Sequence, residues 1–400
     1  MNGSSDIVIT GLQSWHMAMG GNIVNMAKEL ARHHRVLFIN YAVDRFTLLR
    51  QPHTVAVKKY REARAAGYGL LEHIDETLWI YTPDIVLESV SQIKPKWLFD
   101  RINAMNMKRF GSRVKYIVSE LGFKDFILFT DSDFYRSFRL KEILFPKMLV
   151  YYIRDNMIAT DFFRYHGARM EEAMIRKADL VVANSEFLAS YARKYNPRSY
   201  YIGQGCDSEL FNPAKVTAIP EEMQKIREQF SPVIGYIGAL RSLRIDIGLL
   251  EYIAEQSPGW ALVLVGPEDE NFRKSRLHRF PNVFFTGSRK EPELPGYLQS
   301  FDVAINAQVY NEITRGNYPR KIDEYLAMGK PVVATRTEAM QMFSNVVFLA
   351  GTPEEYLACI DKAVLTDSPD LRAKRMATGQ LHSWENNINE LFRCIELVKS

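Results

Sequence analysis

Residues 6–40 are DIVITGLQSWHMAMGGNIVNMAKELARHHRVLFIN, and this stretch decides the fold. The apolar runs at 6–10 and 36–40 predict two strands. Between them, apolar residues at 23, 26, 27 and 30 share one face of a predicted helix, which follows a loop that contains Gly20 and Gly21. A strand, a helix and a second strand in this order form one βαβ unit.

The same alternation continues along the chain. Further strands are predicted at 126–129, 148–153, 180–183 and 200–202, and in the second half at 233–240, 261–266, 283–287, 302–307 and 331–335. Helical patterns separate many of these runs, including one marked by Ile247, Leu250 and Ile253. Alternating strands and helices predict parallel sheets, so the expected fold class is α/β with two Rossmann-like domains.

Length and composition also favour two domains. The chain has 400 residues, and 47% of them are hydrophobic. A chain of this length is too long for one ordinary core. We expect an N-terminal domain at 1–207, an interdomain connection at 208–231, a C-terminal domain at 232–375 and a final helical segment at 376–400. The connection is placed where Asn212, Pro213 and Pro220 surround a polar stretch without a strand.

Charge and cysteine content narrow the setting of the protein. The net charge is +4, but residues 1–200 hold 29 Lys and Arg against 21 Asp and Glu, or +8, and the other residues hold 22 against 26, or −4. The first half is therefore the part that would meet an anionic surface. The three cysteines lack zinc-site spacing, and neither a signal peptide nor about 18 consecutive apolar residues are found, so we expect a reduced, cytosolic setting.

The most informative segment for chemistry is YNEITRGNYPRKIDEYLAMGKPVVAT, residues 310–335. Pro319 stands at a predicted helix start, where backbone N–H groups favour an anion, and Lys321 adds positive charge. Glu324 follows in the first turns and can accept hydrogen bonds from sugar hydroxyls. On spacing alone, the alternative is that Lys321 and Glu324 form an ordinary helix-surface pair.

This segment resembles the donor-binding element of GT-B glycosyltransferases, especially the family-4-like enzymes related to teichuronic acid glycosyltransferases. The resemblance covers most of the chain, because residues 177–189, 203–213, 235–250 and 282–287 match other elements of that group in the same order. It implies two Rossmann-like domains that face each other across a deep cleft, the first for an acceptor and the second for a nucleotide sugar.

By this resemblance, Arg241 and Arg244 would face the donor diphosphate. Lys321 would contact the phosphate or the sugar, and Glu324 the ribose hydroxyls. A leaving nucleoside diphosphate gains negative charge, which a guanidinium group can stabilise without a metal ion. We therefore expect a metal-independent reaction without a cofactor, in which the nucleotide sugar, UDP-linked, is a substrate.

Other positions in the second half belong to the same expected site. The residues that would let the backbone approach the nucleotide are Gly238, Gly266 and Pro267. Many retaining members of the group have a glutamate eight positions before the ribose-binding one, and this chain has Gly316 there. Either Asn317 or Glu312 substitutes for it, or both are ordinary loop residues. The stereochemistry therefore stays open, with inversion favoured.

Asp155 is the candidate general base. It follows the predicted strand at 148–153 and Arg154, so its carboxylate lies at the carboxyl end of a strand, where an acceptor hydroxyl would lose its proton. Inverting glucuronosyltransferases of this fold are similar at this segment and use that aspartate as base. The alternative is that Asp155 caps the next turn or pairs with Arg154. The nearby Asp131 and Asp133 predict a turn or helix cap rather than a metal site.

The first strand-to-helix loop holds a second group of candidates, for the acceptor side of the cleft: Trp15, His16, Gly20, Gly21 and Asn22. The alternatives are that the glycines serve only the turn and that His16 is structural. The loop lacks the spaced glycine triad of dinucleotide-binding proteins, and Asn40 stands where an acidic residue would end the next strand. A dehydrogenase is therefore disfavoured.

Residues 94–115, KPKWLFDRINAMNMKRFGSRVK, hold seven Lys and Arg against one Asp, together with aromatic residues. This pattern is typical of a helix on anionic lipid, and the predicted membrane-facing residues are Lys94, Lys96, Trp97, Lys108 and Arg109. The alternative is a surface helix whose apolar side packs on the first domain. No recognised module accompanies the stretch, so nucleic acid binding is not expected.

The final segment has apolar residues at helical spacing from Trp384 to Ile395. By the same resemblance this helix would cross back to the first domain, and the alternative is packing within the second. Together the features predict a glycosyltransferase, peripheral at the cytoplasmic face of a membrane, that acts on a lipid-linked saccharide in surface polysaccharide or glycolipid synthesis. A nucleotide-sugar epimerase of the same fold and a non-catalytic nucleotide-sugar-binding partner of a synthase complex remain as alternatives.

Overall fold

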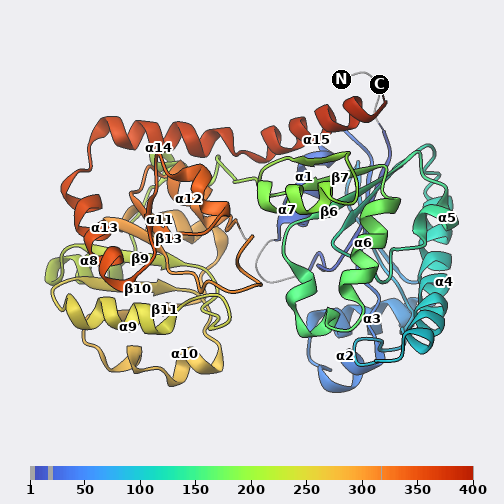
Figure 1. Cartoon of the computed structure of the whole chain (residues 1–400), viewed down its shortest axis with the longest axis horizontal. Coiled ribbons are helices and arrows are strands. Elements are labelled where there is room, and N and C mark those ends of the chain that lie inside the picture. Colours follow the sequence, from blue (N-terminus) through green and yellow to red (C-terminus); the bar gives the residue numbers. More distant parts are fainter. Residues whose placement is uncertain (1–4, 17–20, 317, 400) are drawn as a thin grey trace. The chain divides into compact units, whose positions relative to one another are not determined.

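The chain folds into two compact units (Figure 1). The structure is a computed structural model that describes residues 5–16, 21–316 and 318–399. Unit 1 comprises Met1–Gly203 and Asn387–Ser400, and unit 2 comprises Gln204–Asn386. Each unit has its own parallel sheet and its own buried core, so the predicted α/β class with two Rossmann-like bodies is confirmed.

Unit 1 is built on an eight-stranded sheet with the order β3-β4-β2-β1-β5-β6-β7-β8. Its strands are β1 (Ile7–Gly11), β2 (Val36–Ile39), β3 (Leu70–Asp75), β4 (Leu78–Thr82), β5 (Ile127–Asp131), β6 (Met148–Ile153), β7 (Leu180–Ala183) and β8 (Ser199–Tyr201). Neighbouring strands are parallel except β3 and β4, which form an antiparallel pair at one edge.

The helices of unit 1 follow the strands in sequence. They are α1 (Asn22–Ala31), α2 (Arg45–Arg50), α3 (Val55–Ala66), α4 (Lys96–Glu120), α5 (Leu140–Leu144), α6 (Gly167–Lys177), α7 (Glu186–Arg193) and, from Asn387 on, α15 (Trp384–Lys399), with short 3-10 turns η1 (Met157–Ala159) and η2 (Asp161–Phe163). Phe392 of α15 stacks on His34 with ring centroids 4.7 Å apart. The last helix therefore contributes to the packing of unit 1.

The central strands β1, β5 and β6 are buried along their whole length, as expected for parallel strands covered on both faces. Their register pairs Gly11 with Asp131 and Asp131 with Tyr152. The carboxyl ends of the three strands therefore meet at one edge of the sheet. This edge brings Asp131 close to the residues that follow β6.

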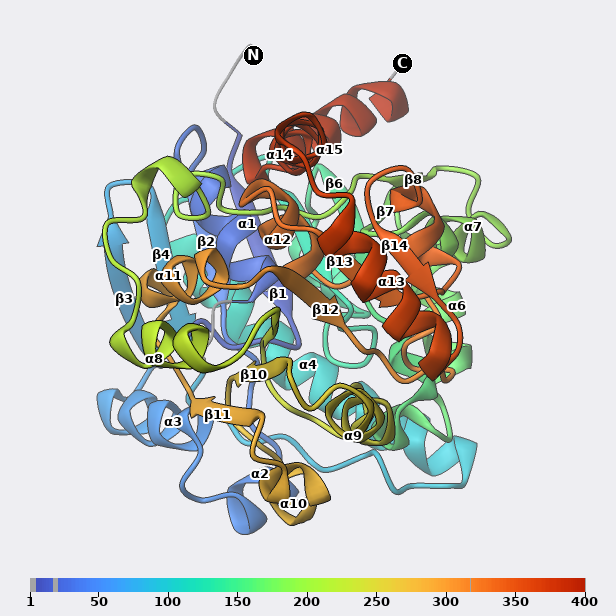
Figure 2. The ribbon, with the colours of Figure 1, turned by 90° about the vertical axis from the view of Figure 1, so that its left-hand side faces the viewer.

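Unit 2 contains a six-stranded parallel sheet with the order β11-β10-β9-β12-β13-β14 (Figure 2). The strands are β9 (Val233–Ile237), β10 (Ala261–Val265), β11 (Val283–Gly287), β12 (Val303–Asn306), β13 (Val332–Thr335) and β14 (Phe348–Ala350). The helices are α8 (Glu221–Gln229), α9 (Ile247–Gln256), α10 (Glu270–Lys274), α11 (Leu294–Gln299), α12 (Lys321–Ala327), α13 (Pro353–Leu365) and α14 (Pro369–Leu381). The 3-10 turns are η3 (Pro213–Lys215), η4 (Arg276–Arg279), η5 (Glu291–Glu293) and η6 (Ala339–Phe343).

The segment predicted as an interdomain connection, 208–231, lies within unit 2. It contains α8, whose Met223 and Ile226 are buried in the core of the unit together with Phe211. Only a narrow stripe of two apolar residues is buried in this nine-residue helix, and most of its other residues are charged. The sequence pattern therefore gave little sign that the helix packs on a core. The chain passes between the units at Gly203 and again at Asn387.

The basic stretch at 94–115 lies mostly in α4, which runs along the outer side of unit 1 (Figure 1). Its Phe99, Phe110 and Val114 are buried in the core of the unit. The apolar side of the helix thus packs on unit 1, as the alternative interpretation predicted. Within the described residues, none of the helices combines the length and the hydropathy that crossing a bilayer requires.

Candidate functional site

Two glycine turns bring the ends of β9 and β10 together in unit 2. Gly238 has φ of 143° and Gly266 has φ of 150°, in a region that side chains disfavour. A Cβ atom on Gly266 would lie 2.0 Å from the carbonyl oxygen of Gly238, so the close approach requires glycine. The backbone N–H of Leu240 then donates to the carbonyl oxygen of Pro267 at 2.8 Å. The predicted residues Gly238, Gly266 and Pro267 are therefore neighbours.

A pocket of about 260 Å³ lies beside this turn, at the carboxyl ends of β9 and β12 and at the start of α12. It brings together three residues predicted to bind a donor, Arg241, Arg244 and Lys321. The other lining residues are Tyr236, Ala239, Ile245, Asn306, Gln308, Thr314 and Pro319. Ligands of parallel α/β sheets collect at such strand ends, so the position is that of a binding site.

The charge of this pocket is one-sided. The described residues that line it include three cations and no Asp or Glu. Lys321 Nζ donates to the hydroxyl of Tyr236 at 2.9 Å and lies 4.5 Å from the centre of that ring. In the parts of the chain that the structure describes, neither Lys321 nor Arg241 pairs with a carboxylate. Uncompensated positive charge in a recess predicts an anionic ligand.

Glu324 lies one turn behind Lys321 and does not line the pocket. Its Oε1 forms an ion pair with Nε of Arg320 at 2.7 Å, and its side chain is 9% exposed. The spacing suggested a helix-surface pair between Lys321 and Glu324. In the structure, Glu324 pairs with Arg320 instead. Asn317, also predicted for this site, lies outside the described residues.

Three polar residues of the pocket lining, Asn306, Gln308 and Thr314, were not predicted from the sequence. Asn306 Nδ2 donates to Gln308 Oε1 at 3.2 Å, and Gln308 Nε2 donates to the carbonyl oxygen of Thr314 at 2.9 Å. The hydroxyl of Tyr356 donates to the carbonyl oxygen of Asn306 at 3.0 Å. The signal for Asn306 and Gln308 was their position at the carboxyl end of the predicted strand at 302–307, which is where binding residues of such sheets lie.

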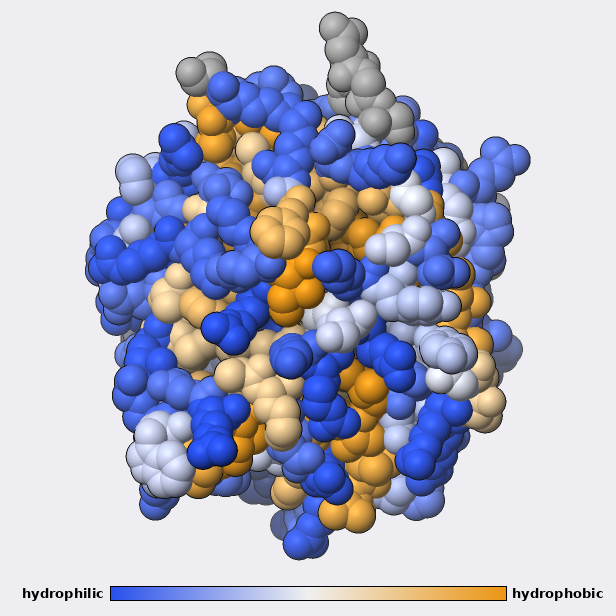
Figure 3. Space-filling view, turned by 90° about the vertical axis from the view of Figure 1, so that its right-hand side faces the viewer, coloured by the Kyte–Doolittle hydropathy of each residue, from blue (hydrophilic) through white to orange (hydrophobic). Residues whose placement is uncertain are grey.

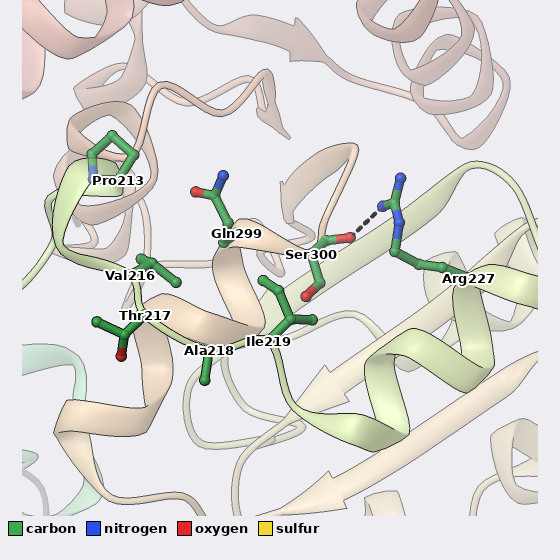
Figure 4. Close-up of a pocket in the computed structure, with 8 residues that line it drawn as sticks. All are labelled: Pro213, Val216, Thr217, Ala218, Ile219, Arg227, Gln299 and Ser300. Carbon is green, nitrogen blue, oxygen red and sulfur yellow. Dashed lines mark hydrogen bonds between the residues drawn. The ribbon is translucent and has the colours of Figure 1, made fainter.

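A larger pocket of about 430 Å³ lies elsewhere in unit 2 (Figure 4). Its lining residues are Pro213, Val216, Thr217, Ala218, Ile219, Arg227, Gln299 and Ser300. The cation in this wall, Arg227, donates to the carbonyl oxygen of Ser300 at 2.6 Å and pairs with Asp302 at 3.0 Å. Because that charge is compensated, the larger pocket is the poorer candidate for an anionic ligand.

In unit 1, a charged cluster stands at the carboxyl ends of β5 and β6. Arg154 Nε lies 2.8 Å from Asp131 Oδ1, and its NH1 lies 3.6 Å from Asp155 Oδ2. Asp131 is fully buried, Arg154 is 12% exposed and Asp155 is 16% exposed. Burial raises the pKa of Asp131, against the opposing effect of Arg154. Asp155 thus pairs with Arg154, one of the two structural roles considered for it, and it stays accessible to a hydroxyl.

The neighbouring Asp133 has a different partner. Its two oxygens accept from the backbone N–H and from Nε of Arg136, both at 3.1 Å, so Asp133 caps the turn that follows. The two aspartates of the Asp-Ser-Asp sequence therefore have different roles: Asp133 caps a turn, and Asp131 forms an ion pair. Among the described residues, no group of His, Cys, Asp and Glu side chains is arranged to hold a metal ion.

The loop after β1 places its candidates in separate contacts. Trp15 packs edge-on against Phe38, and Lys28 lies 5.9 Å from the Trp15 ring. His16 Nε2 lies 2.8 Å from Glu72 Oε2, and this contact is consistent with a structural role for His16. Gly20 lies outside the described residues.

Gly21 and Asn22 form the entry to α1. Gly21 is the N-cap of α1, and Asn22 is its first residue. A Cβ atom on Gly21 would lie 2.1 Å from Oε1 of Gln13, the end of a flexible side chain that can move aside. The backbone of Gly21 is extended, with φ of −99°, so neither its conformation nor this contact requires glycine.

The predicted membrane-facing residues do not form one patch of free charge. Lys96 pairs with Asp100 at 3.2 Å, Arg109 lies 3.9 Å from Glu88, and Lys94 lies 5.6 Å from the ring of Tyr165. Lys108 stands on α4, and its carbonyl oxygen accepts from Ser112. Trp97 is 68% exposed. Figure 3 shows this side of unit 1, where apolar side chains occur in small groups between polar ones.

Residues 231–364 match the family described as Glycosyl transferases group 1. The match contains every residue that lines the cationic pocket. Unit 2 carries a glycosyl transferases group 1 domain. The cationic pocket therefore lies within the matched domain.

A protein of Bacillus subtilis (strain 168) named as a teichuronic acid biosynthesis glycosyltransferase, TuaH, is 29% identical to the chain over 233 residues. The aligned part is 56% of this chain and 57% of TuaH, so the chain spans little more than half the length of that relative. The predicted resemblance to GT-B glycosyltransferases related to teichuronic acid glycosyltransferases is confirmed.

Solved structures agree with the group 1 assignment in fold. Sucrose-phosphate synthase from Thermosynechococcus elongatus has a TM-score of 0.70 at 16% identity, over 98% of this chain and 99% of that one. Anabaena HepE in complex with UDP has a TM-score of 0.66 at 16% identity, over the same shares. At this identity the likeness shows the fold, and the fold is GT-B.

Proposed function

We propose that the protein is a glycosyltransferase that transfers a sugar from a nucleoside diphosphate sugar to a saccharide acceptor. The observation that carries the proposal is the pocket of unit 2, where Arg241, Arg244 and Lys321 meet and the described lining residues include no carboxylate. A diphosphate fits such a set of donors, because its oxygens can be shared among several cations.

The chemistry of the leaving group supports this assignment. As the glycosidic bond to the donor sugar breaks, the diphosphate gains negative charge, and fixed cations stabilise that charge more than they stabilise the intact donor. Lys321 is fixed in advance by its hydrogen bond to Tyr236. In the proposal the arginines and Lys321 do this without a metal ion. The ribose hydroxyls are assigned to Glu324, whose charge Arg320 balances.

Asp155 is proposed as the general base. An acceptor hydroxyl that attacks the anomeric carbon directly must lose its proton, and direct attack inverts the configuration there. Arg154 lies between Asp131 and Asp155, and its ion pair with Asp155 holds this carboxylate at the carboxyl end of β6. The proposal therefore couples inversion at the donor sugar to proton transfer onto Asp155.

The proposals for the nucleotide base of the donor and for the acceptor come from the similar proteins. HepE was crystallised with UDP, and the name of TuaH refers to teichuronic acid biosynthesis. We extend both to this chain by proposing a UDP-sugar donor and a lipid-linked saccharide of a surface polysaccharide as acceptor. Peripheral association with the cytoplasmic face of a membrane is proposed through the basic residues around α4.

The first test is binding of nucleoside diphosphates. Purified protein is titrated with uridine, guanosine, adenosine and thymidine diphosphates, with and without a metal chelator, and binding is followed by thermal shift and calorimetry. One nucleotide should stabilise the wild-type protein, and Lys321→Ala should weaken that binding about tenfold or more, since a hydrogen bond to a charged group contributes about 1.5–3 kcal/mol.

Lys274→Ala is the matched control, because Lys274 is an exposed lysine of unit 2 that pairs with Glu270. It should bind as the wild type does. Binding of none of the nucleotides, or equal loss in both variants, would contradict the donor site. Incubation with the sugar nucleotide alone separates the other readings: a changed sugar nucleotide indicates an epimerase, and binding without turnover under any acceptor condition indicates a non-catalytic partner.

A further inference from the structure

Behind the cationic pocket, unit 2 contains a buried cluster of three side chains, Tyr318, Asp323 and His382. The hydroxyl of Tyr318 lies 2.5 Å from each oxygen of Asp323 and 2.6 Å from Nδ1 of His382. His382 Nδ1 lies 2.7 Å from Asp323 Oδ1. Asp323 is fully buried, and the side chain of His382 is 18% exposed. The three groups are mutually hydrogen-bonded, with little access to water.

The cluster is continuous with the pocket through the backbone. Tyr318 directly precedes Pro319, and Asp323 stands in α12 two residues after Lys321; Pro319 and Lys321 both line the pocket. A shift of Tyr318 or Asp323 would therefore move the segment that presents Lys321. The position of this segment depends on whether the cluster holds together.

The third member comes from a distant part of the sequence. His382 is the C-cap of α14, and α14 packs closely on α12, because a Cβ atom on Gly379 would lie 2.4 Å from the backbone nitrogen of Ala327. The carbonyl oxygen of His382 accepts from the backbone N–H of Cys206 at 2.7 Å, and Gln204 Nε2 donates to the carbonyl oxygen of Tyr318. The cluster thus ties α12 to both segments of unit 2 that lead to unit 1, near residues 204 and 386.

The charges around His382 favour its protonated form. Burial alone would lower the pKa of His382, but the hydrogen bond and the charge of Asp323 raise it above the usual value. Burial raises the pKa of Asp323, against His382 and Tyr318. Phe343, the other ring against His382, is uncharged.

Among the described residues, other titratable and charged groups lie on the elements packed around the cluster. They include Glu324 and Arg320, which pair with each other at the start of α12, and Cys206 and Asp207 on the segment that contacts His382. With Glu324 balanced by Arg320, His382 is the cation that faces Asp323.

We propose that Tyr318, Asp323 and His382 are positioning residues that hold the Pro319–Lys321 segment for the donor, and that donor affinity falls when His382 loses its proton. The inference rests on the proposed donor site and adds a control on it. Loss of the proton leaves the buried Asp323 carboxylate without its cation, which is costly. The cluster relieves this cost by loosening, and Lys321 then loses its fixed position.

The test is a pH series of diphosphate binding, by calorimetry from pH 6 to pH 9, with the four nucleoside diphosphates named above. Wild type is compared with His382→Gln and Tyr318→Phe, and His278→Gln is the control, because His278 is a partly exposed histidine of unit 2 paired with Glu268. The ionisation of the ligand itself is common to all proteins and cancels in the ratio of affinities.

The ratio of wild-type to His382→Gln affinity should fall about fivefold between pH 6 and pH 9, a modest coupling between two sites. Tyr318→Phe keeps the ring, so it should fold and bind more weakly at pH 6 with a smaller pH dependence. If the ratio of wild-type to His382→Gln affinity does not change with pH, the inference is overturned and the donor site stands. If circular dichroism shows that His382→Gln does not fold, the ratio of wild-type to Tyr318→Phe affinity is used instead, and a ratio that does not change with pH again overturns the inference. Failure of the wild type to bind any diphosphate overturns the donor site itself.

Discussion

Each unit places an arginine just after a buried central strand, but the two arginines have different surroundings. In unit 2, Arg241 follows β9, is exposed and joins Lys321 in a pocket whose described lining residues include no carboxylate. In unit 1, Arg154 follows β6 and lies between Asp131 and Asp155. The partners of each arginine decide its role: the charge of Arg241 is available to a ligand, whereas the charge of Arg154 orders the carboxylates around it.

The largest expected effect comes from Asp155 of the compensated cluster. Asp155→Asn should lower the rate of sugar transfer about 100- to 10,000-fold, because the amide cannot accept the proton of the acceptor hydroxyl. Nucleoside diphosphate affinity should not change, since Asp155 belongs to unit 1 and the cationic pocket to unit 2. The measurement is release of nucleoside diphosphate from the sugar nucleotide in the presence of a saccharide-bearing lipid extract. Asp161→Asn, an exposed acid of unit 1, is the control and should keep wild-type activity. An active Asp155→Asn enzyme would remove the base from the proposal.

The next effect is on stability, and it separates the two arginines directly. Arg154→Met leaves the fully buried Asp131 without its cation and should lower the free energy of unfolding by about 3–5 kcal/mol. Arg241→Met removes an exposed charge and should change it by less than about 0.5 kcal/mol. Urea denaturation followed by circular dichroism measures both. Equal stability of the two variants would contradict the distinction drawn between the sites.

The sequence was sufficient for the fold and for most of the cationic pocket. Strand and helix periodicity predicted the central strands of both sheets, and the resemblance to GT-B glycosyltransferases indicated Arg241, Arg244 and Lys321, which do line one pocket. These features could be predicted because each depends on a local pattern, an apolar run followed by glycine or a charged residue. The resemblance to a family supplied the roles.

Features that depend on distant partners could not be predicted. Asp131 pairs with Arg154, 23 residues later in the chain, rather than capping a turn. His382 lies 59 residues after Asp323, so no local pattern joins them. The edge strand β3 is mostly exposed, and its sequence, LLEHID, lacks a continuous apolar run. Partners across the fold decide which charges are compensated.

Unit 1 also contains a buried carboxyl group, Glu171, whose side-chain partners among the described residues are tyrosines. Glu171 accepts hydrogen bonds from the hydroxyls of Tyr151 at 3.0 Å and Tyr191 at 3.3 Å, and burial raises its pKa to about 7. The folded protein therefore keeps a proton on Glu171 that the unfolded chain, with a pKa near 4.5, releases. Stability from this group is present below about pH 4.5 and is lost as the pH rises through about 7, in total about 3 kcal/mol.

Glu171→Gln removes this titration and keeps a similar shape. The difference in unfolding free energy between wild type and variant should shift by about 3 kcal/mol from pH 4.5 to pH 7.5, with the variant favoured at the higher pH. Urea denaturation at a series of pH values gives the difference directly. Glu172→Gln, on the solvent side of the same helix and paired with Arg176, is the control and should show no such shift. A difference independent of pH would mean that Glu171 is ionised in the folded protein, with a cost that its tyrosines offset.

The smallest effect concerns Arg241 as a ligand contact. Arg241→Ala should weaken nucleoside diphosphate binding about fivefold to tenfold, less than Lys321→Ala, because an exposed guanidinium is partly screened by water and salt. The loss should shrink as sodium chloride is raised from about 0.05 M to about 0.5 M, since the attraction is screened in the wild type as well. Arg273→Ala, also in unit 2 but outside the pocket lining, should bind like the wild type at every salt concentration. If Arg241→Ala bound the diphosphate normally, Arg241 would contribute no ligand contact, and the attraction of the pocket for the diphosphate would have to come from its other cations, Lys321 and Arg244.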